Sequence, residues 1–589
     1  SAGSQQTSTG SREFVVELNL YDEGAKKFAD ATQTAYENGY TIGIYYDNEF
    51  ISVPKVSAHI TDGNAVINGM SDYQTADNIA STIRIGALPV KLEEVRSQVV
   101  GAKLGQDAIH TSLLAGAIGL AVIILFMIIV YRIPGLAASI ALCIYTMLVL
   151  IIINVAGLTF TLPGIAGIIL SIGMAVDANV IIFERIKEEL GTGKTVQSAM
   201  KIGFNKAFSA IFDGNITTLI AAFVLGLKGS GAVKGFAYTL AIGIIVSMFT
   251  ALVITRLLLK LFYDFGAKNE QLYGVIKDTK TFNFIGKKNI FFCISAALIL
   301  IGIVTVSVNG ARGKGMFNYG LDFKGGTSTT VTFNQDYSQS EIESTIIPDI
   351  VSAIGDSTVQ QQKVQGGNDV VFKTNNLTIE QREALEKLFT SKYGVEQSSI
   401  LTENISGAVS NEMKTDAVVA VIIATICMLL YIWFRFKDIR FAGSAVLALL
   451  HDVLVVVGFY AVARITLGNT FIACMLTIVG YSINATIVIF DRIRENLGQM
   501  GKADLAEIVN ASISQTMRRS VYTTLTTFIM VVILFILGVS AIREFAAPLM
   551  VGIICGAYSS VCITGALWLV MKKKIGGGQA QTVKATAGA

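Results

Sequence analysis

Long apolar runs dominate the hydrophobic pattern of the chain. A helix rises about 1.5 Å per residue, so about 20 apolar residues cross a hydrocarbon core of roughly 30 Å. Eleven segments reach this length, and they lie at about 113–131, 136–156, 163–184, 208–227, 236–262, 289–308, 415–435, 441–463, 470–490, 520–538 and 546–571. The pattern predicts a polytopic α-helical membrane protein.

Two regions between these runs have the shorter periods of soluble domains. In residues 1–110, strands are predicted at Phe14–Leu20, Tyr40–Ser52 and Lys55–Gly69, and helices at Asp22–Gly39 and Asp72–Ile85. In residues 309–413, strands are predicted near Ser328–Phe333 and Val370–Lys373, and helices near Ser340–Ile354 and Ile379–Tyr393. Both regions are predicted to be small α+β domains of the ferredoxin-like, split βαβ type.

These boundaries divide the chain into seven parts. We expect a first soluble domain, five spans, a linker, a single span, a second soluble domain, five further spans and a tail, at residues 1–110, 111–262, 263–288, 289–308, 309–413, 414–571 and 572–589. The chain begins at Ser1 without a signal peptide. We interpret this start as a truncation, because one further span before it would make the two halves alike.

Composition agrees with a membrane protein and excludes several other classes. Hydrophobic residues make up 52% of the chain and charged residues 15%, against about a quarter in a typical soluble protein. A net charge of +3 is too small to indicate a nucleic-acid partner. The six cysteines lie inside apolar runs without a CxxC pair, and the three histidines are scattered, so neither a disulfide nor a metal cluster is predicted.

Basic residues predict the orientation in the membrane. Most of them flank the spans on one side, in the loop 185–206, the linker, residues 435–440 and 492–502, and the tail. The opposite short loops hold Lys228, Lys234, Arg464 and Arg543. By the positive-inside rule the first side is cytoplasmic. Both soluble domains are then expected on the outer face.

The two halves carry an internal repeat. The stretch GMAVDANVIIFERIKEEL from Gly173 aligns without gaps with GYSINATIVIFDRIRENL from Gly480, at an offset of 307 residues. The next helix repeats as well, since ITTLIAAFVLGL from Ile216 resembles LTTFIMVVILFIL from Leu525. Repeats of this kind are typical of transporters, whose sites lie where the halves meet.

The motifs resemble the fused SecD–SecF protein-export family of the RND superfamily. SecD-like motifs are HITDGNAVING at His59, GALPVKLE at Gly86, the Gly173 stretch and FDGNITTLIA at Phe212; SecF-like motifs are FNFIGKKN at Phe282, YGLDFKGGT at Tyr319, HDV at His451 and the Gly480 stretch. They occur in SecD-then-SecF order over nearly the whole chain.

The resemblance implies an accessory subunit of the Sec translocase in the bacterial cell membrane. Such a subunit uses the proton motive force to promote late stages of preprotein export. The partners it implies are a SecYEG-type translocon, YajC- and YidC-type proteins, unfolded preprotein on the outer face, membrane lipid and protons. It implies no enzyme activity and no cofactor, and the sequence contains no catalytic triad or nucleotide site.

Asp177 is the main candidate for chemistry. It lies about seven residues, or roughly 10 Å, inside the cytoplasmic end of its predicted span. An ionised carboxylate is costly in lipid, so Asp177 should be paired, protonated or turned toward the bundle interior. Reversible protonation would suit a proton carrier, and the resemblance places Asp177 at the proton-relay position of the family. The alternative is a structural, hydrogen-bonding aspartate.

Two residues on neighbouring helices extend the predicted relay. Asp213 is either a second relay acid or the N-cap of a helix that starts at its Asp-Gly-Asn sequence. Arg519 begins the equivalent helix of the second half, and the resemblance places a functional arginine there. Arg519 could instead be an interfacial residue, as we expect for its neighbour Arg518. Asn179 and Asn215 are expected to form hydrogen bonds between helices.

His451 and Asp452 are ionisable residues well inside a predicted span. Adjacent helical residues do not face each other, so they need not act together. Either could join a relay or bond a neighbouring helix. One departure from the family concerns Ala485: SecF proteins usually carry an acid after the asparagine that is Asn484 here. Coupling then rests on Asp177 alone, with Asp452 or Asn484 assisting, or is altered.

Three functions compete at this point. The first is the proton-driven Sec accessory motor. The second is an RND-type exporter of lipids or small molecules, which would share the repeat and the acid but would need larger outer domains. The third is a passive translocon scaffold without proton coupling, which Ala485 favours.

Overall fold

The computed structural model describes residues 2–6, 12–46, 49–70, 72–86, 94, 96–100, 102–229, 231–275, 281–313, 315–363, 368–500 and 503–575. The chain divides into two compact units after Glu94. Most of the GALPVKLE motif (87–93) and most of the predicted tail (576–589) lie outside the described residues.

The first unit is a small α+β domain. Its elements are β1 (Ala2–Gln6), β2 (Arg12–Asn19), α1 (Asp22–Asn38), β3 (Ile44–Tyr46), β4 (Glu49–Ser52), β5 (Asn64–Met70) and α2 (Tyr73–Gly86). An antiparallel sheet has the order β1-β2-β5, and β3 and β4 form a separate hairpin. Helix α2 packs on the sheet, so Val16 and Ile67 are buried against Ala76 and Ala80. The predicted strand at Lys55–Gly69 begins only at Asn64.

The second soluble domain completes the predicted split βαβ arrangement. Its elements are β6 (Arg96–Val100), β7 (Asn318–Tyr319), α10 (Leu321–Lys324), β8 (Gly326–Thr332), α11 (Gln339–Glu341), η4 (Ile342–Ile346), α12 (Ile347–Ile354), β9 (Gln360–Lys363), β10 (Asp369–Thr374), α13 (Ile379–Lys392), η5 (Gln397–Ser399) and β11 (Ile400–Ile405). The main sheet is antiparallel in the order β6-β11-β8-β10-β9. Its core contains Phe333, Phe372 and Phe389.

One predicted boundary is wrong. The sequence predicts that residues 96–100 belong to the first soluble domain, because they precede the first span. They form β6, which pairs with β11 at the edge of the second domain's sheet. A short polar strand carries no signal that identifies its partner, because pairing is set by residues about 300 positions away in the chain.

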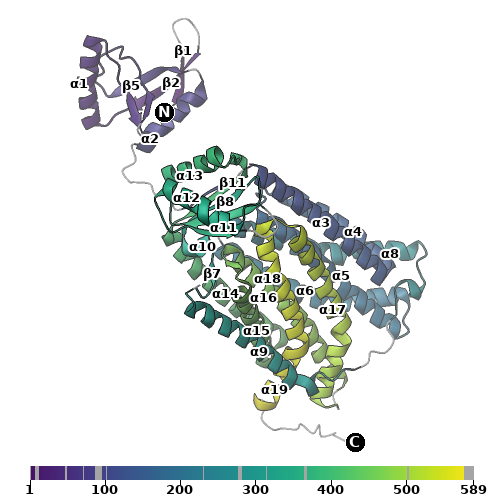
Figure 1. Ribbon diagram of the computed structural model, residues 1–589. Helices are drawn as coiled ribbons and strands as arrows, with labels where there is room; N and C mark the ends of the chain where they lie inside the picture. Colours follow the sequence, from purple (N-terminus) through teal and green to yellow (C-terminus); the bar gives the residue numbers. More distant parts are fainter. Residues whose placement is uncertain are drawn as a thin grey trace, which may run out of the picture. The chain divides into compact units, whose positions relative to one another are not determined.

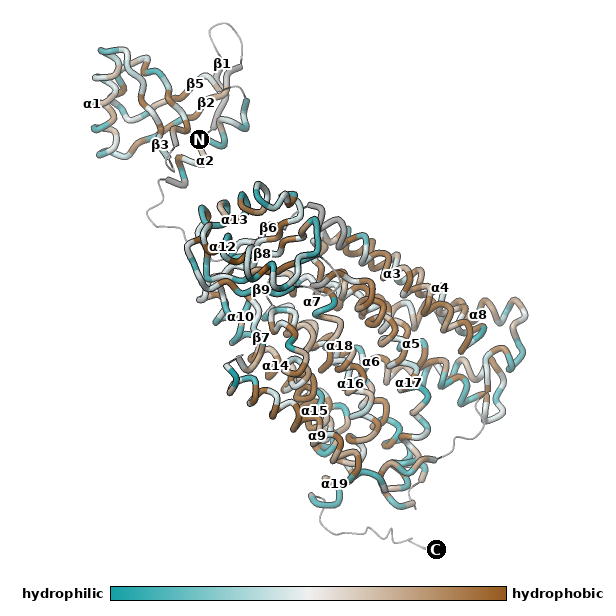
Figure 2. Tube along the Cα trace, viewed as in Figure 1, coloured by the Kyte–Doolittle hydropathy of each residue, from teal (hydrophilic) through white to brown (hydrophobic). Residues whose placement is uncertain are grey.

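All eleven predicted spans are helices of the second unit, and they extend beyond their apolar cores (Figures 1 and 2). They are α3 (Ala102–Tyr131), α4 (Ile133–Val155), α5 (Leu162–Gly191), α6 (Val196–Lys228), α7 (Ala232–Phe249) continued by η1 (Thr250–Ile254) and α8 (Thr255–Asp264), α9 (Lys288–Ala311), α14 (Gly407–Phe436), α15 (Ile439–Ala463), α16 (Asn469–Gln499), α17 (Leu505–Leu537), and α18 (Ser540–Tyr558) continued by η6 (Ser559–Thr564) and α19 (Gly565–Ile575). Short 3-10 turns, η2 (Glu270–Leu272) and η3 (Ile285–Lys287), precede α9, and β12 (Thr466–Leu467) precedes α16.

Helices α5 and α16 are the most enclosed of these spans. Their apolar windows are 94% and 89% buried, against 11% for the span that contains α9. Helix α5 packs against α6, α7 and α17, and α16 packs against α6, α17 and α18. The two repeat-bearing helices therefore form the centre of the bundle.

The internal repeat is also present in the irregular backbone of the last span of each half. A π-helical segment interrupts the last span of each half, at Thr250–Ile254 and Ser559–Thr564. The two segments begin 309 residues apart, which is the offset of the preceding repeated helix. Such segments are rare and occur mostly as single turns inside α-helices. Matching positions support a duplication more strongly than matching apolar residues do.

Gly326 is required where β8 begins. Its φ is +116°, and a Cβ there would lie 2.3 Å from the Thr374 carbonyl oxygen. We predict that Gly326→Ala destabilises the protein by about 3 kcal/mol, since it combines backbone strain with a main-chain clash. The measurement is the melting temperature in detergent. Gly355→Ala is the control, because Gly355 has a φ of +71° and open space around it. Equal losses for the two variants would contradict the clash.

Candidate functional site

Asp177 lies near the middle of α5, at the contact between the two halves. Its side chain is buried, and its Oδ2 accepts a hydrogen bond of 2.6 Å from Nδ2 of Asn484 on α16. Asn484 is the residue 307 positions after Asp177, which is the offset of the repeat. The pseudo-symmetry therefore pairs a carboxyl group with an amide across the interface.

Arg519 lines the same small pocket as Asp177. It lies inside α17, which begins at Leu505, so the prediction that Arg519 begins a helix is wrong. Arg519 is buried, and its Nε and Nη2 have no hydrogen-bond partner among the described residues. The pocket is also lined by Tyr481, Asn484, Ala485 and Thr523. Within the described part of the chain, a buried guanidinium with two N–H-bearing nitrogens that lack a partner therefore lines the same pocket as a carboxyl group.

The close approach of α6 holds Asn484 in place. A Cβ on Gly214 would lie 2.0 Å from Oδ1 of Asn484. Only a glycine at this position lets the amide lie between α6 and Asp177. Tyr481, one turn before Asn484, donates its hydroxyl to the Thr523 carbonyl oxygen at 3.1 Å. These contacts fix the side of α16 that faces the carboxyl group.

Two reciprocal ion pairs join α5 and α16 nearer their C-terminal ends. Arg185 lies 3.3 Å from Glu495, and Arg492 lies 2.6 Å from Glu188. Arg492 and Glu495 follow Arg185 and Glu188 by the repeat offset of 307. Each arginine also pairs with the glutamate three residues later on its own helix. The four side chains form a two-fold symmetric network that holds the two repeat helices together.

This network predicts a coupled pair of mutations. Arg492→Glu alone places three carboxylates together and should lower the melting temperature. Adding Glu188→Arg restores opposite charges, and we expect a coupling of about 1–2 kcal/mol between the two changes. Thermal unfolding in detergent of both single variants and the double variant measures it. Additive losses would contradict a direct contact.

Asp213 belongs to a different cluster. It lies in the interior of α6, so the predicted N-cap role is wrong. Its carboxylate accepts hydrogen bonds of 2.6 Å from Arg435 Nε and 2.8 Å from the Tyr431 hydroxyl, both on α14. Asp213 is therefore an ion-paired residue between α6 of the first half and α14 of the second.

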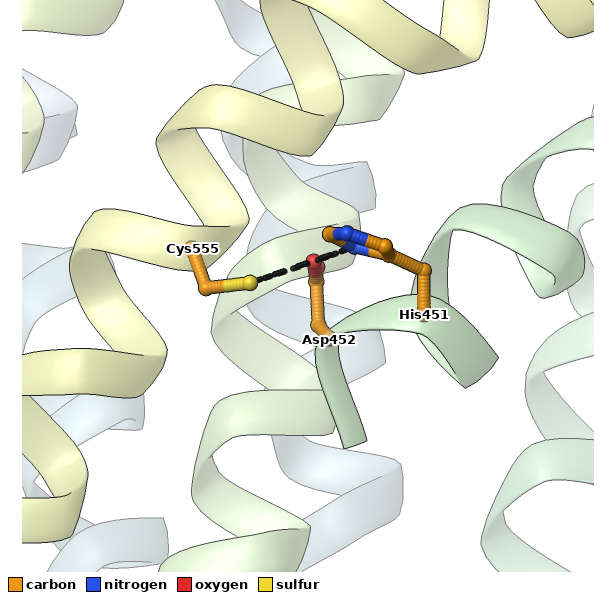
Figure 3. A group of neighbouring side chains, drawn as sticks. All are labelled: His451, Asp452 and Cys555. Carbon is orange, nitrogen blue, oxygen red and sulfur yellow. Dashed lines mark hydrogen bonds and ion pairs between the residues drawn. The ribbon is translucent and has the colours of Figure 1, made fainter. Parts of the chain in front are cut away.

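His451 and Asp452 lie side by side, contrary to the expectation for adjacent helical residues. Their Nδ1 and Oδ1 atoms are 2.9 Å apart, and Cys555 of α18 donates its thiol to the same oxygen at 3.2 Å (Figure 3). The other carboxylate oxygen accepts the hydroxyls of Ser482 at 2.6 Å and Ser559 at 2.7 Å.

The grouping corrects one further expectation. A histidine, an aspartate and a cysteine come together although the sequence predicted no such cluster. Four partners, His451, Cys555, Ser482 and Ser559, use both oxygens of Asp452, so hydrogen bonds account for the cluster. The sequence held little signal for it, since Cys555 lies about 100 residues from Asp452 in an apolar run.

The two asparagines behave differently. Asn179 accepts a hydrogen bond of 2.9 Å from Thr255 on α8, as predicted for an interhelical bond. Asn215 donates to the Ile211 carbonyl oxygen of its own helix at 2.8 Å, so that prediction is wrong. Sequence reasoning also missed Tyr481 and Thr523, whose only signal is their place one turn from a repeat residue.

Family models match most of the chain. The model described as "Protein export membrane protein SecD/SecF, C-terminal" matches residues 84–264 and 384–574, more than half of the chain. The "SecDF, P1 head subdomain" matches residues 1–90, and the "SecD/SecF GG Motif" matches residues 317–336. The last match contains the segment from β7 to β8.

Relatives and solved structures agree with the family models. The chain is 36% identical to the protein translocase subunit SecDF of Bacillus subtilis, over 97% of this chain and 81% of that protein. It is 38% identical to SecDF of Thermus thermophilus, over 95% and 74%. A crystal structure of Thermus SecDF, described as a translocon-associated membrane protein, covers 97% of this chain with a TM-score of 0.76 at 36% identity, and the match covers 77% of that structure.

A more distant structure shares the fold alone. The hedgehog release protein Disp from a water bear has a TM-score of 0.51 at 11% identity, over 79% of this chain and 71% of that structure. Together with the eleven spans among the described residues, these matches show a multi-pass membrane protein in which both partners of a SecD–SecF pair are fused. The chain belongs to the SecD/SecF family of protein-export membrane proteins.

Proposed function

We propose that the chain is an accessory subunit of a Sec protein translocase that uses the proton motive force to promote late stages of preprotein export. Its relatives are named as protein translocase subunits. The observation that carries the proton coupling is the buried Asp177 beside Asn484 and Arg519 at the contact between the halves. The proposed partners are a SecYEG-type translocon, YajC- and YidC-type proteins, lipid and unfolded preprotein.

The geometry suggests how the site works. When Asp177 is ionised, it accepts the Asn484 amide and faces the positive charge of Arg519, whose Nε and Nη2 have no other hydrogen-bond partner in the described ranges. Protonation removes the negative charge, and the guanidinium then loses the carboxylate with which it shares the pocket. Because buried interfaces between helices have discrete packings, this change favours a different arrangement of α5, α16 and α17.

The driving force is large enough for such a cycle. Moving one elementary charge across about 100 mV yields about 2.3 kcal/mol, which biases a coupled step by roughly 50-fold. We place the site in the bacterial cell membrane with both soluble domains on the outer face, as the basic residues predict. The relay roles of Asp213, His451 and Asp452 stay predictions, and each of these residues has a structural partner.

The exporter and scaffold alternatives carry less support. The distant likeness to Disp shows the fold alone. The relatives that match nearly the whole of this chain are named as protein translocase subunits. A scaffold would not need a buried carboxyl group that shares a pocket with a buried arginine.

Ala485 occupies the position where SecF proteins usually carry an acid, so the effect of restoring that acid can be predicted. It lines the pocket of Asp177 and Arg519. Ala485→Asp places a second carboxyl group beside the guanidinium, and we expect it to raise gradient-stimulated export by about two- to threefold, since two carboxyl groups that bind and release protons give a larger change of charge around the arginine than Asp177 alone. Ala485→Asn is the control for size and polarity. An increase with both variants would rule out an effect of charge.

The function is tested by export of a reporter precursor into inverted membrane vesicles. Vesicles with and without the chain are compared, each with and without a proton gradient, after ATP-driven insertion has begun. The proposal predicts that the chain adds a gradient-dependent increment. An increment that persists when the gradient is collapsed favours the passive scaffold. The exporter alternative predicts no effect on the precursor in either condition.

A further inference from the structure

The helix that carries Asn484 has its N-terminus capped by the second soluble domain. Oδ2 of Asp322, in α10, accepts a hydrogen bond of 2.8 Å from the backbone N–H of Asn469, the first residue of α16. The N-cap residue of α16 itself is Gly468, which has no side chain to cap the helix. The first N–H groups of a helix have no partner within it, so Asp322 supplies a contact that the helix lacks.

In the first half of the repeat, the N-terminus of the central helix is capped by a residue next to it in the sequence. Thr161 is the N-cap of α5, and its hydroxyl accepts a hydrogen bond from the N–H of Gly164 at 3.1 Å. Gly468 follows Thr161 by the repeat offset of 307. A Cβ on Gly468 would lie 2.8 Å from Oδ2 of Asp322, so the glycine makes room for the carboxylate. One half caps its central helix locally, and the other uses a residue of the soluble domain.

The connection from Asp322 into the soluble domain is short. Four residues after Asp322, Gly326 begins β8, which lies inside the five-stranded sheet between β11 and β10. Around Asp322, Tyr319 of β7 pairs with Leu467 of β12, and the Gly320 N–H donates to the Leu467 carbonyl oxygen at 3.0 Å. The sheet and the start of α16 are therefore linked through several bonds.

The connection from Asp322 into the bundle is rigid. Helix α16 is a continuous α-helix from Asn469 to Gln499, without the π-helical interruption found in the last span of each half. Asn484 lies 15 residues beyond Asn469, or roughly 22 Å along the helix. A displacement of the N-terminus therefore reaches the amide that binds Asp177.

We propose that Asp322 couples the second soluble domain to the Asp177 site by holding the N-terminus of α16, so that movement of the domain shifts Asn484 relative to the carboxyl group. This proposal rests on the proposed function and assigns Asp322 as a positioning residue. Burial raises the pKa of the Asp322 carboxyl group, while the Asn469 N–H and the positive charge of Arg96 oppose that rise. Coupling of this kind is reciprocal, so the state of Asp177 also acts on the domain.

The variants separate coupling from simple capping. Asp322→Ala removes both the cap and the link. Asp322→Asn keeps an oxygen that can accept the Asn469 N–H. Asp322→Ala with Gly468→Thr supplies a local cap, as Thr161 does in the first half, without a bond to the soluble domain; the backbone of Gly468 is extended, with φ −130°, and accommodates threonine.

Two measurements are made on each full-length variant in detergent. One is the melting temperature. The other is the fraction of Asp177 labelled by a hydrophobic carbodiimide at one fixed pH, determined by peptide mass spectrometry. Carbodiimide reacts with the protonated carboxyl group, so labelling rises when Asn484 no longer stabilises the carboxylate. Neither measurement needs a gradient or preprotein. A failure of the coupling role of Asp322 can therefore be distinguished from a failure of the proposed function in export.

We expect Asp322→Ala to increase the labelling of Asp177 about threefold, which corresponds to the loss of one interhelical hydrogen bond. Asn484→Ala should increase the labelling by the same factor. Combining the two substitutions should add nothing further. Asp322→Asn should label like the unchanged chain. The Gly468→Thr double variant should regain the melting temperature but keep the raised labelling, and it carries the test if Asp322→Ala alone does not fold. Labelling that returns to its original value in the double variant would overturn the proposal, as would additive effects of Asp322→Ala and Asn484→Ala.

Discussion

Asp177→Asn is expected to remove the gradient-stimulated part of precursor export while leaving the ATP-driven part in place. Asparagine has nearly the same shape and keeps an oxygen that can accept the Asn484 amide, but it cannot gain or lose a proton. The expected loss is the whole increment, because no other described carboxyl group lines the pocket with Arg519. The vesicle export assay with and without a gradient measures it.

The matched control is Glu189→Gln on the same helix. Glu189 is also buried and ion-paired, with Lys194 and Lys206, but it lies outside the pocket. Its replacement removes a carboxylate from α5 without touching Asp177. Export of the two variants should differ chiefly in the response to the gradient. Full stimulation in Asp177→Asn, or an equal loss in both variants, would contradict a proton-carrying role for Asp177.

Asp452→Ala is expected to destabilise the second half by about 3 kcal/mol or more, because it leaves several buried donors without their acceptor. The carboxylate is fully buried and receives the Ser482 and Ser559 hydroxyls and the Cys555 thiol. Loss of all these bonds also leaves a void between α15, α16 and α18. The measurement is the melting temperature in detergent. Unfolding is monitored by tryptophan fluorescence, to which the buried Trp568 contributes.

Two milder variants define the cause of that loss. Asp452→Asn keeps one acceptor oxygen and the side-chain volume, so its effect should be about half as large. Ser482→Ala removes a single donor and should cost about 1 kcal/mol. A melting temperature for Asp452→Ala equal to that of the unchanged chain would show that the cluster does not hold these helices together.

The sequence predicted the helices well because their signal is local. A run of about 20 apolar residues identifies a span wherever it lies in the chain. The repeat at Gly173 and Gly480 also identifies α5 and α16 as equivalent helices, and in the structure Asn484 contacts its repeat equivalent Asp177. The alternation in residues 309–413 predicted β8, β10 and α13 for the same reason.

Features that depend on distant residues were not predictable. The polar strand β6 joins a sheet whose other strands lie more than 200 residues later in the chain. Cys555 and Asp452 meet only when α18 packs on α15. Asp213 was ambiguous because a mid-helix aspartate and an N-cap aspartate look alike until the helix boundaries are known. Asp322 carried no signal by itself, because its partner is a backbone N–H nearly 150 positions away.

The proposed route of protons across the membrane during export is the Asp177 site. Its most direct test is proton flux into proteoliposomes that contain the chain, a Sec translocon and a translocating preprotein, with a pH-sensitive dye in the lumen and an imposed potential. We expect flux with the unchanged chain and with Glu189→Gln, and flux at the protein-free background with Asp177→Asn. Equal flux in Asp177→Asn and the unchanged chain would contradict it.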